Sequence, residues 1–401
     1  MILSPAFRTA FSAIFLGMGI GATAMAFANS SHESDLTNSR SPYDIWSMGP
    51  DTQLKPSGQE TTPATPDAPF QVEVLRKRKD YALNIPGLTL NLSNGQSIQL
   101  GRDGSFKAPV FCSGNVAATV TFETPYFGIG TKSWGSGSTY TLSFNLPCSG
   151  HTKIWGDKDS ALASVLGIWT IGYIGQEKLK ESVGLEFWKD KITFNYPGDG
   201  AYYMNNTVTL TNGEEWDVVG HEFGHAIFDQ GRVGRMQGGQ HYIDRCYGET
   251  LAMSEGWASY FSAFLSVALD DKDAKFEFMV PRRAPLRFET IPADVCNGYG
   301  NEWRVTGFLW DTIDTNQDAE VLAEQFGAAW HLTTGKMASG LSNIRDSLIA
   351  GGFNRDEIAR IWSQNSSGGS APSPFQPSNF ENFQQSQSTF QLFDDFLKGG
   401  R

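Results

Sequence analysis

A histidine pair four residues apart constrains the fold of this chain more than any other feature. The segment reads His221-Glu222-Phe223-Gly224-His225. Residues four apart share one face of an α-helix, so a helix here lets both imidazole rings reach one metal ion. Glu222 then lies where its carboxylate can reach a water molecule on that metal. The sequence therefore predicts a zinc-binding helix, with His221 and His225 as ligands and Glu222 as the general base.

Residues around the motif predict where this helix begins and ends. Thr211 and Glu214 have the spacing of a capping box, which predicts the helix start. Gly231 is placed to end the helix. Gly224 inside a helix costs about 1 kcal/mol relative to alanine. We therefore expect another backbone to approach closely at Gly224.

A catalytic zinc usually has three protein ligands and an open position, so a third ligand must come from elsewhere. We expect it to be Glu255, in a second helical pattern from about 249 to 269. Its helical neighbours are mostly small and would allow close packing: Leu251, Ala252, Ala258, Ser259 and Ser262. A carboxylate without a partner is unfavourable in such surroundings. Glu249 is the alternative ligand.

Two stretches resemble known zinc peptidases. Residues 217–227 look like the active-site helix of thermolysin-like enzymes. Ser254-Glu255-Gly256-Trp257 looks like the glutamate-ligand helix of the related fungalysins. The resemblance covers roughly residues 200–262. It implies a gluzincin, a zinc peptidase with two histidines and one glutamate as ligands.

The same resemblance implies further site residues. Ala201, Tyr202 and Tyr203 resemble the edge strand on which such enzymes lay an extended substrate. A free strand edge can hold a peptide by β-addition. These enzymes carry an aspartate four residues after the glutamate ligand, where it orients the first histidine. This chain has Ser259 there, which can accept a hydrogen bond but brings no charge.

A second departure concerns the group that stabilises the oxyanion, for which the family uses a downstream histidine. Tyr299 is the nearest counterpart in this chain, since a phenol can donate to a developing oxyanion. Tyr247 and His331 are alternatives, and His241 is a weaker one.

Other features predict an exported protein. Residues 1–28 have the pattern of a signal peptide, with a small-residue cleavage site at 26–28. The apolar run 161–174 is too short to span a bilayer and predicts a core helix. The four cysteines of the chain allow three disulfide connectivities. We favour Cys112–Cys148 and Cys246–Cys296, because each pair falls within one predicted domain. The net charge of −12 argues against nucleic acid and anionic membranes as partners.

The predicted fold class is α+β. Residues 29–67 are polar and predict a flexible leader. Alternating patterns over 68–150 predict a small β-sandwich. Within it, Asp103-Gly104-Ser105-Phe106 resembles the turn of regulatory-like domains of carboxypeptidases. Residues 151–365 would form the zinc peptidase domain, with a mixed β/α lobe, a helical lobe and the site between them. Residues 366–401 predict a disordered tail.

A calcium site is a further hypothesis. Asp311, Asp314, Asn316 and Asp318 form an oxygen-rich segment, and Asp217 occupies the position of a calcium-binding acid in thermolysin-like enzymes. Neither spacing matches an EF-hand.

Three functions are compatible with these patterns. The first is a secreted zinc endopeptidase acting on proteins or peptides. The second is a zinc exopeptidase of the same group. The third is a secreted binding or adhesion protein that has kept the fold and lost activity. The sequence does not predict cleavage specificity or oligomeric state.

Overall fold

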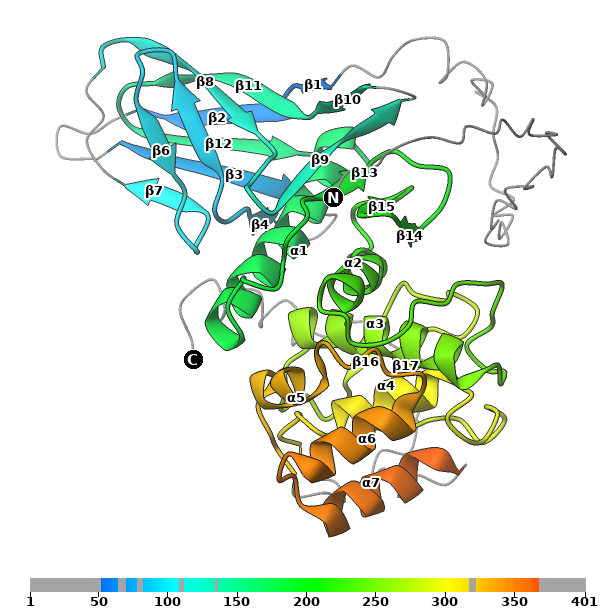
Figure 1. Ribbon diagram of the computed structural model, residues 1–401. Helices are drawn as coiled ribbons and strands as arrows, with labels where there is room; N and C mark the ends of the chain where they lie inside the picture. The colour runs from blue at the N-terminus through cyan, green and yellow to red at the C-terminus, as the bar shows by residue number, and fades with distance from the viewer. Residues whose placement is uncertain are drawn as a thin grey trace, which may run out of the picture.

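A computed structural model describes residues 52–63, 70–77, 82–107, 112–133, 136–316 and 322–367. The signal-peptide prediction and almost all of the predicted tail lie outside these residues. The helices are α1 (Ala161–Ser182), α2 (Trp216–Gln230), α3 (Glu249–Ser266), α4 (Glu302–Trp310), α5 (Phe326–Thr333), α6 (Leu341–Ala350) and α7 (Arg355–Ser366). Strands lie mainly in the first half of the chain and helices in the second, which confirms the α+β class (Figure 1).

Two sheets form the first part of the molecule. One has the order β1-β11-β8-β5-β6, and the other has the order β2-β12-β3-β4 with β7 also paired to β3. Their strands are β1 (Gln53–Leu54), β2 (Gly58–Thr62), β3 (Gln71–Lys77), β4 (Ala82–Asn84), β5 (Thr89–Leu92), β6 (Ser97–Gln99), β7 (Ser105–Lys107), β8 (Asn115–Thr121), β11 (Thr141–Pro147) and β12 (His151–Gly156). Alternate residues of β8 and β11 are buried, as the sequence pattern predicts.

The predicted boundary at residue 150 is wrong. A third sheet has the order β10-β9-β13-β15-β14 and takes strands from both sides of that boundary. Its members are β9 (Phe127–Ser133), β10 (Ser136–Thr139), β13 (Ile192–Asn195), β14 (Tyr202–Met204) and β15 (Thr207–Thr209). Strands β9 and β13 pair in parallel. Buried residues of all three sheets belong to one continuous core, so the two predicted domains share their interior.

The prediction of a flexible leader over 29–67 is wrong where the structure describes it. Strand β1 pairs with β11, and β2 pairs with β12. Strand β2 is polar and mostly exposed, so it has no apolar alternation that a sequence pattern could reveal. Its order comes from backbone hydrogen bonds at the edge of a sheet formed by later residues.

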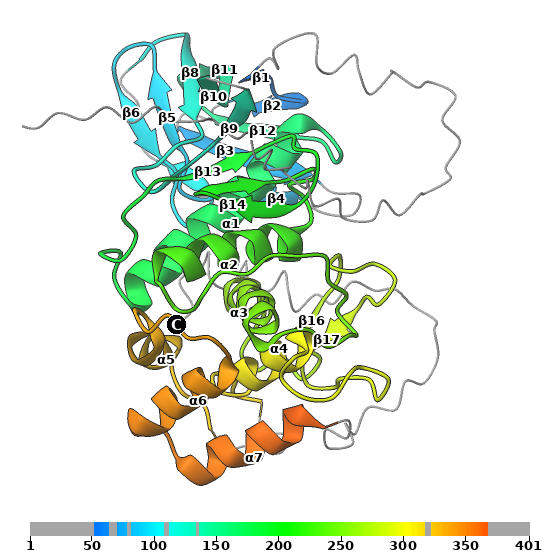
Figure 2. The ribbon, with the colours of Figure 1, turned by 45° about the vertical axis from the view of Figure 1, so that its right-hand side comes forward.

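Helices α1 and α2 lie between the β-rich part and the helices that follow (Figures 1 and 2). Helix α1 contacts β3, β9 and β12, while α2 contacts β14 and β15. Most of α1 is buried, which confirms the predicted core helix. None of the helices within the described residues has the length and apolar character needed to cross a membrane.

Two disulfides connect distant segments, Cys112–Cys148 and Cys246–Cys296. Both match the connectivity favoured from the sequence. Cys246 precedes α3 and Cys296 precedes α4, so the second disulfide ties together the segments that lead into these two helices.

Candidate metal centre

The histidine motif lies on α2, as predicted, but the predicted capping box is wrong. The helix begins at Trp216, and its N-cap residue Glu215 makes no side-chain cap hydrogen bond. Glu214 instead accepts a hydrogen bond from the amide of Asp159 at 2.7 Å. Glu214 therefore holds the turn before α1 and does not reach back to Thr211. Gly231 caps the C-terminus of α2, as predicted.

Helices α2 and α3 cross in close contact at the motif. A Cβ atom on Gly224 would lie 2.6 Å from the carbonyl oxygen of Ala258 and 2.8 Å from its Cα. This is the close backbone approach expected at Gly224. Gly220 faces Ser262 in the same way, because a Cβ atom on Gly220 would overlap the hydroxyl oxygen of Ser262. The small side chains on α3 thus bring its backbone against α2.

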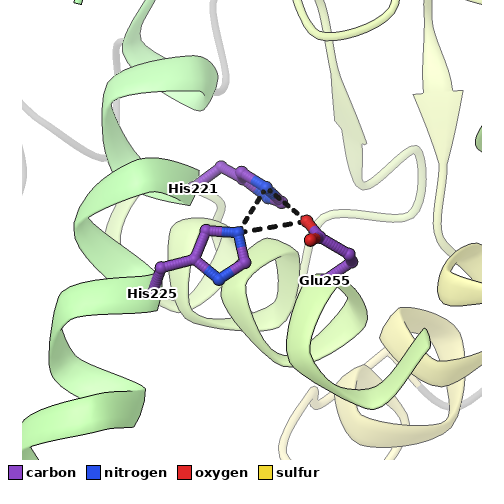
Figure 3. Close-up of side chains that lie close together, drawn as sticks. All are labelled: His221, His225 and Glu255. Carbon is purple, nitrogen blue, oxygen red and sulfur yellow. Dashed lines mark hydrogen bonds and ion pairs between the residues drawn. The ribbon is translucent and has the colours of Figure 1, made fainter. Parts of the chain in front are cut away.

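The crossing places His221, His225 and Glu255 together. Figure 3 shows the two rings from α2 and the carboxylate from α3 pointing at one another. The Nε2 atoms of the histidines are 3.2 Å apart, and Glu255 Oε2 lies 3.2 Å from His221 Nε2 and 3.0 Å from His225 Nε2. All three residues are buried, with 5–7% of their surface exposed.

These distances fit a zinc ion. Tetrahedral bonds of about 2.0–2.1 Å place ligand atoms about 3.3 Å apart, close to the observed 3.0–3.2 Å. Two ring nitrogens and a carboxylate oxygen facing one another in a buried space are electron-rich, and a shared cation satisfies them all. The donor set of two imidazoles and one carboxylate is also one that zinc prefers.

Burial and the neighbouring ionisable groups together shift the pKa values around this centre: against the effect of burial, the Glu255 carboxylate raises the pKa of His225 to about 9. Burial lowers the pKa of His221 to about 4, so its ring is neutral, as a metal ligand must be. Against the effect of burial, the neighbouring histidines hold the pKa of Glu255 below its usual range. Burial raises the pKa of Glu222 to about 7, which is close to the value that suits a general base near neutral pH.

Ser259 lies where the sequence places it, beside the first histidine. Its Oγ is 3.0 Å from His221 Nδ1. The hydroxyl accepts this hydrogen bond when Nδ1 carries the ring proton, which leaves the Nε2 lone pair facing Glu255. Glu249, the alternative ligand, is exposed at the first turn of α3 and does not join the cluster.

The structure does not bring Tyr299 to the cluster of His221, His225 and Glu255. Its hydroxyl donates to the carbonyl of Trp362 at 2.6 Å, and its ring packs on the Trp362 ring with centroids 4.0 Å apart. Tyr299 therefore anchors α7 to the start of α4. Of the alternatives, His331 is exposed on α5, whereas the ring of Tyr247 lies edge-on to His241, with centroids 6.5 Å apart.

The predicted edge strand is present. Among the described residues, strand β14 ends its sheet and pairs with β15 alone. Tyr202 and Tyr203 belong to β14, and Ala201 directly precedes it. The hydroxyl of Tyr203 donates to Asp229 of α2 at 2.7 Å, which fixes the strand against the helix that carries the histidines.

Sequence reasoning missed Glu302. This residue begins α4 and is buried, and its Oε2 lies 3.3 Å from His241 Nε2. His241 Nε2 is also 3.7 Å from Glu255 Oε2. An acidic residue in the first turn of a helix is ordinarily explained by the helix dipole, so Glu302 gave no separate signal.

The residues of the calcium hypothesis make hydrogen bonds within the protein. Asp217 Oδ2 accepts hydrogen bonds from the backbone amides of residues 277–279 at 2.7–3.2 Å. Asp311 accepts from Asn365 at 2.6 Å, and Asp314 accepts from the amide of Asn316 at 3.1 Å. Asp318 lies outside the described residues. The two metal-ligand clusters found in the described parts of the chain contain none of these residues.

Comparisons with known proteins give no match that bears on this site. No model of a protein family matches the chain, and no curated protein sequence matches it.

Proposed function

We propose that this protein is an exported zinc-dependent peptidase of the gluzincin type. The convergence of His221, His225 and Glu255 within 3.0–3.2 Å of one another carries the proposal. A zinc ion held by these residues would polarise a substrate carbonyl and lower the pKa of a water molecule. The two disulfides support export, because such bonds persist in oxidising compartments.

The other residues in this proposal act around that centre. Glu222 is buried on the same turn of α2. It accepts a proton from the attacking water and transfers it to the leaving amine. The free edge of β14 binds the substrate backbone in extended form. This arrangement favours internal segments of a peptide chain, and therefore an endopeptidase.

Peptide cleavage by the purified, oxidised protein tests the proposal. At matched zinc occupancy we expect the wild type to cleave a broad peptide library and Glu222→Gln to lose about 100-fold or more of the rate. Glu255→Gln should lose zinc, whereas Glu249→Gln, which alters an exposed acid of the same helix, should keep both zinc and activity. Mapping the cut sites separates endopeptidase from exopeptidase.

Two results would count against the proposal. Zinc-loaded wild type that cleaves no member of the library would favour a binding protein. Equal cleavage by wild type and Glu222→Gln would remove Glu222 from the mechanism.

A further inference from the structure

A second group of metal-ligand atoms adjoins the first. It consists of His241, Glu302 and Glu255, and Glu255 belongs to both groups. His241 lies on the segment between α2 and α3, and Glu302 begins α4. Their side chains are 14% and 7% exposed. Three separate elements thus supply donors to this position.

The ring of His241 is oriented as a metal ligand would be. Its Nδ1 lies 2.9 Å from the carbonyl oxygen of Gly239 and donates to it. Metal-binding histidines ordinarily donate their second ring nitrogen to a carbonyl or carboxylate in this way. In the neutral ring, the lone pair on Nε2 then faces the carboxylate oxygens of Glu302 and Glu255 at 3.3 and 3.7 Å.

A network of contacts fixes the spacing between His241 and Glu302. The side-chain amide of Asn301 donates to the carbonyls of Ile243 and Arg245 at 2.7 and 2.9 Å. The Cys246–Cys296 disulfide joins the same two segments. Arg304 holds the Cys296 carbonyl at 2.6 Å. Such a framework keeps donors in place before a ligand binds.

Charge also favours a cation at this position. Glu222, Glu255 and Glu302 are all buried, with 4–6% of their surface exposed. An ion at the first position would balance two of these three carboxylates and leave one for a second cation, since a buried carboxylate without a counter-charge is strongly unfavourable.

We infer that His241, Glu302 and Glu255 bind a second divalent transition metal, with Glu255 bridging the two ions. Two ligand atoms at about 2.1 Å from one ion lie about 3–4 Å apart, which matches the observed 3.3 and 3.7 Å. Paired metals that clamp a carbonyl and its attacking water are typical of several hydrolase classes. The inference rests on the proposed function, because it extends the same centre.

Metal stoichiometry tests the inference. Metal-free, oxidised protein is titrated with Zn²⁺, and bound zinc per chain is measured by mass spectrometry after gel filtration. We expect about two ions for the wild type and about one for His241→Ala and Glu302→Gln. His331→Ala removes an exposed histidine of α5 and should keep both ions. X-ray absorption should show a zinc–zinc distance of about 3.5–4 Å in the wild type and in His331→Ala, but not in His241→Ala or Glu302→Gln.

The possible outcomes separate this inference from the proposed function. A single ion in the wild type at saturating zinc would overturn the second site, leave His241 and Glu302 as a hydrogen-bonded pair, and preserve the proposed function. Two ions in both variants would overturn the ligand assignment. No bound zinc in the wild type would overturn both proposals. Circular dichroism and melting curves confirm that each variant is folded before it is counted.

Discussion

At the scale of single residues, Ser259 sets the properties of the first histidine. A neutral hydroxyl 3.0 Å from His221 Nδ1 orients the ring without adding negative charge. A carboxylate at this position would make the imidazole more basic and a stronger ligand. The hydroxyl therefore orients the ring but would make it a weaker ligand for a bound metal than a carboxylate would.

Removal of this hydroxyl should weaken metal binding. We expect Ser259→Ala to lower zinc affinity about 10- to 100-fold, because ring orientation is lost while every ligand remains. Competition with a chromogenic chelator measures the change. Ser266→Ala is a matched control, since Ser266 is a buried serine of α3 whose hydroxyl has no hydrogen-bond partner among the described residues. Equal affinities for both variants would show that Ser259 does not orient His221.

At the scale of secondary-structure elements, the crossing of α2 and α3 determines whether a site exists. The ligands come from two helices, so the separation of the helix axes sets the distance between the histidines and Glu255. Glycine and small residues at the crossing allow the backbones to touch.

A single methyl group at the crossing should disturb both packing and metal binding. Gly224→Ala places a Cβ 2.6 Å from a backbone oxygen that cannot move independently of α3. We expect a loss of about 1–3 kcal/mol in the free energy of unfolding, together with weaker zinc binding. Gly248→Ala is the control, because a Cβ there meets nothing within 4 Å. Chemical denaturation of both variants measures the difference, and equal stabilities would contradict the tight crossing.

The packing of α1 against α3 predicts a pH dependence of stability. Lys178 of α1 donates to the carbonyl of Phe264 at 2.7 Å, and burial lowers its pKa from 10.5 to about 8. Between these values the unfolded chain binds more protons than the folded one, so this residue makes stability rise with pH. We expect Lys178→Met to lack that rise. Denaturation curves recorded from pH 7 to 10.5 give the free energy of unfolding of both proteins at each pH. The same pH dependence in the wild type and the variant would exclude the effect.

At the scale of the whole molecule, the two disulfides lie at different distances from the candidate site. Cys112–Cys148 lies in the β-rich part, whereas Cys246–Cys296 joins segments that position His241 and Glu302. Their sequence separations are 36 and 50 residues. Because these loops have similar closure entropies, each disulfide should stabilise the fold by about 4 kcal/mol.

Removal of each disulfide should separate stability from metal binding. We expect the paired cysteine-to-serine variants at 112/148 and at 246/296 to lose similar amounts of unfolding free energy. Only the 246/296 variant should also lose zinc affinity and activity, since it loosens the framework near the proposed metal centre. Denaturation and zinc titration on both variants measure these effects. A similar loss of zinc affinity in the 112/148 variant would show that this loss is a general consequence of lower stability.

The sequence located some parts of this molecule better than others. Helix α1, the alternating burial of β8 and β11, and the motif on α2 were predictable because helical and strand periodicity are local properties. The polar strand β2 was not, because an edge strand held by backbone hydrogen bonds needs no apolar pattern. Pairing of β9 with β13 was missed for a related reason, since a strand does not encode its partner locally.

The sequence by itself determined that His221 and His225 share a helix face, that Glu222 lies between them, and which residues are small enough for a close helix crossing. Only the tertiary structure decided which distant groups meet. It directed the Tyr299 hydroxyl to Trp362 and brought His241 and Glu302 together from separate segments. The physical reason is range: helical periodicity acts over a few residues, whereas contacts between segments depend on how the whole core packs.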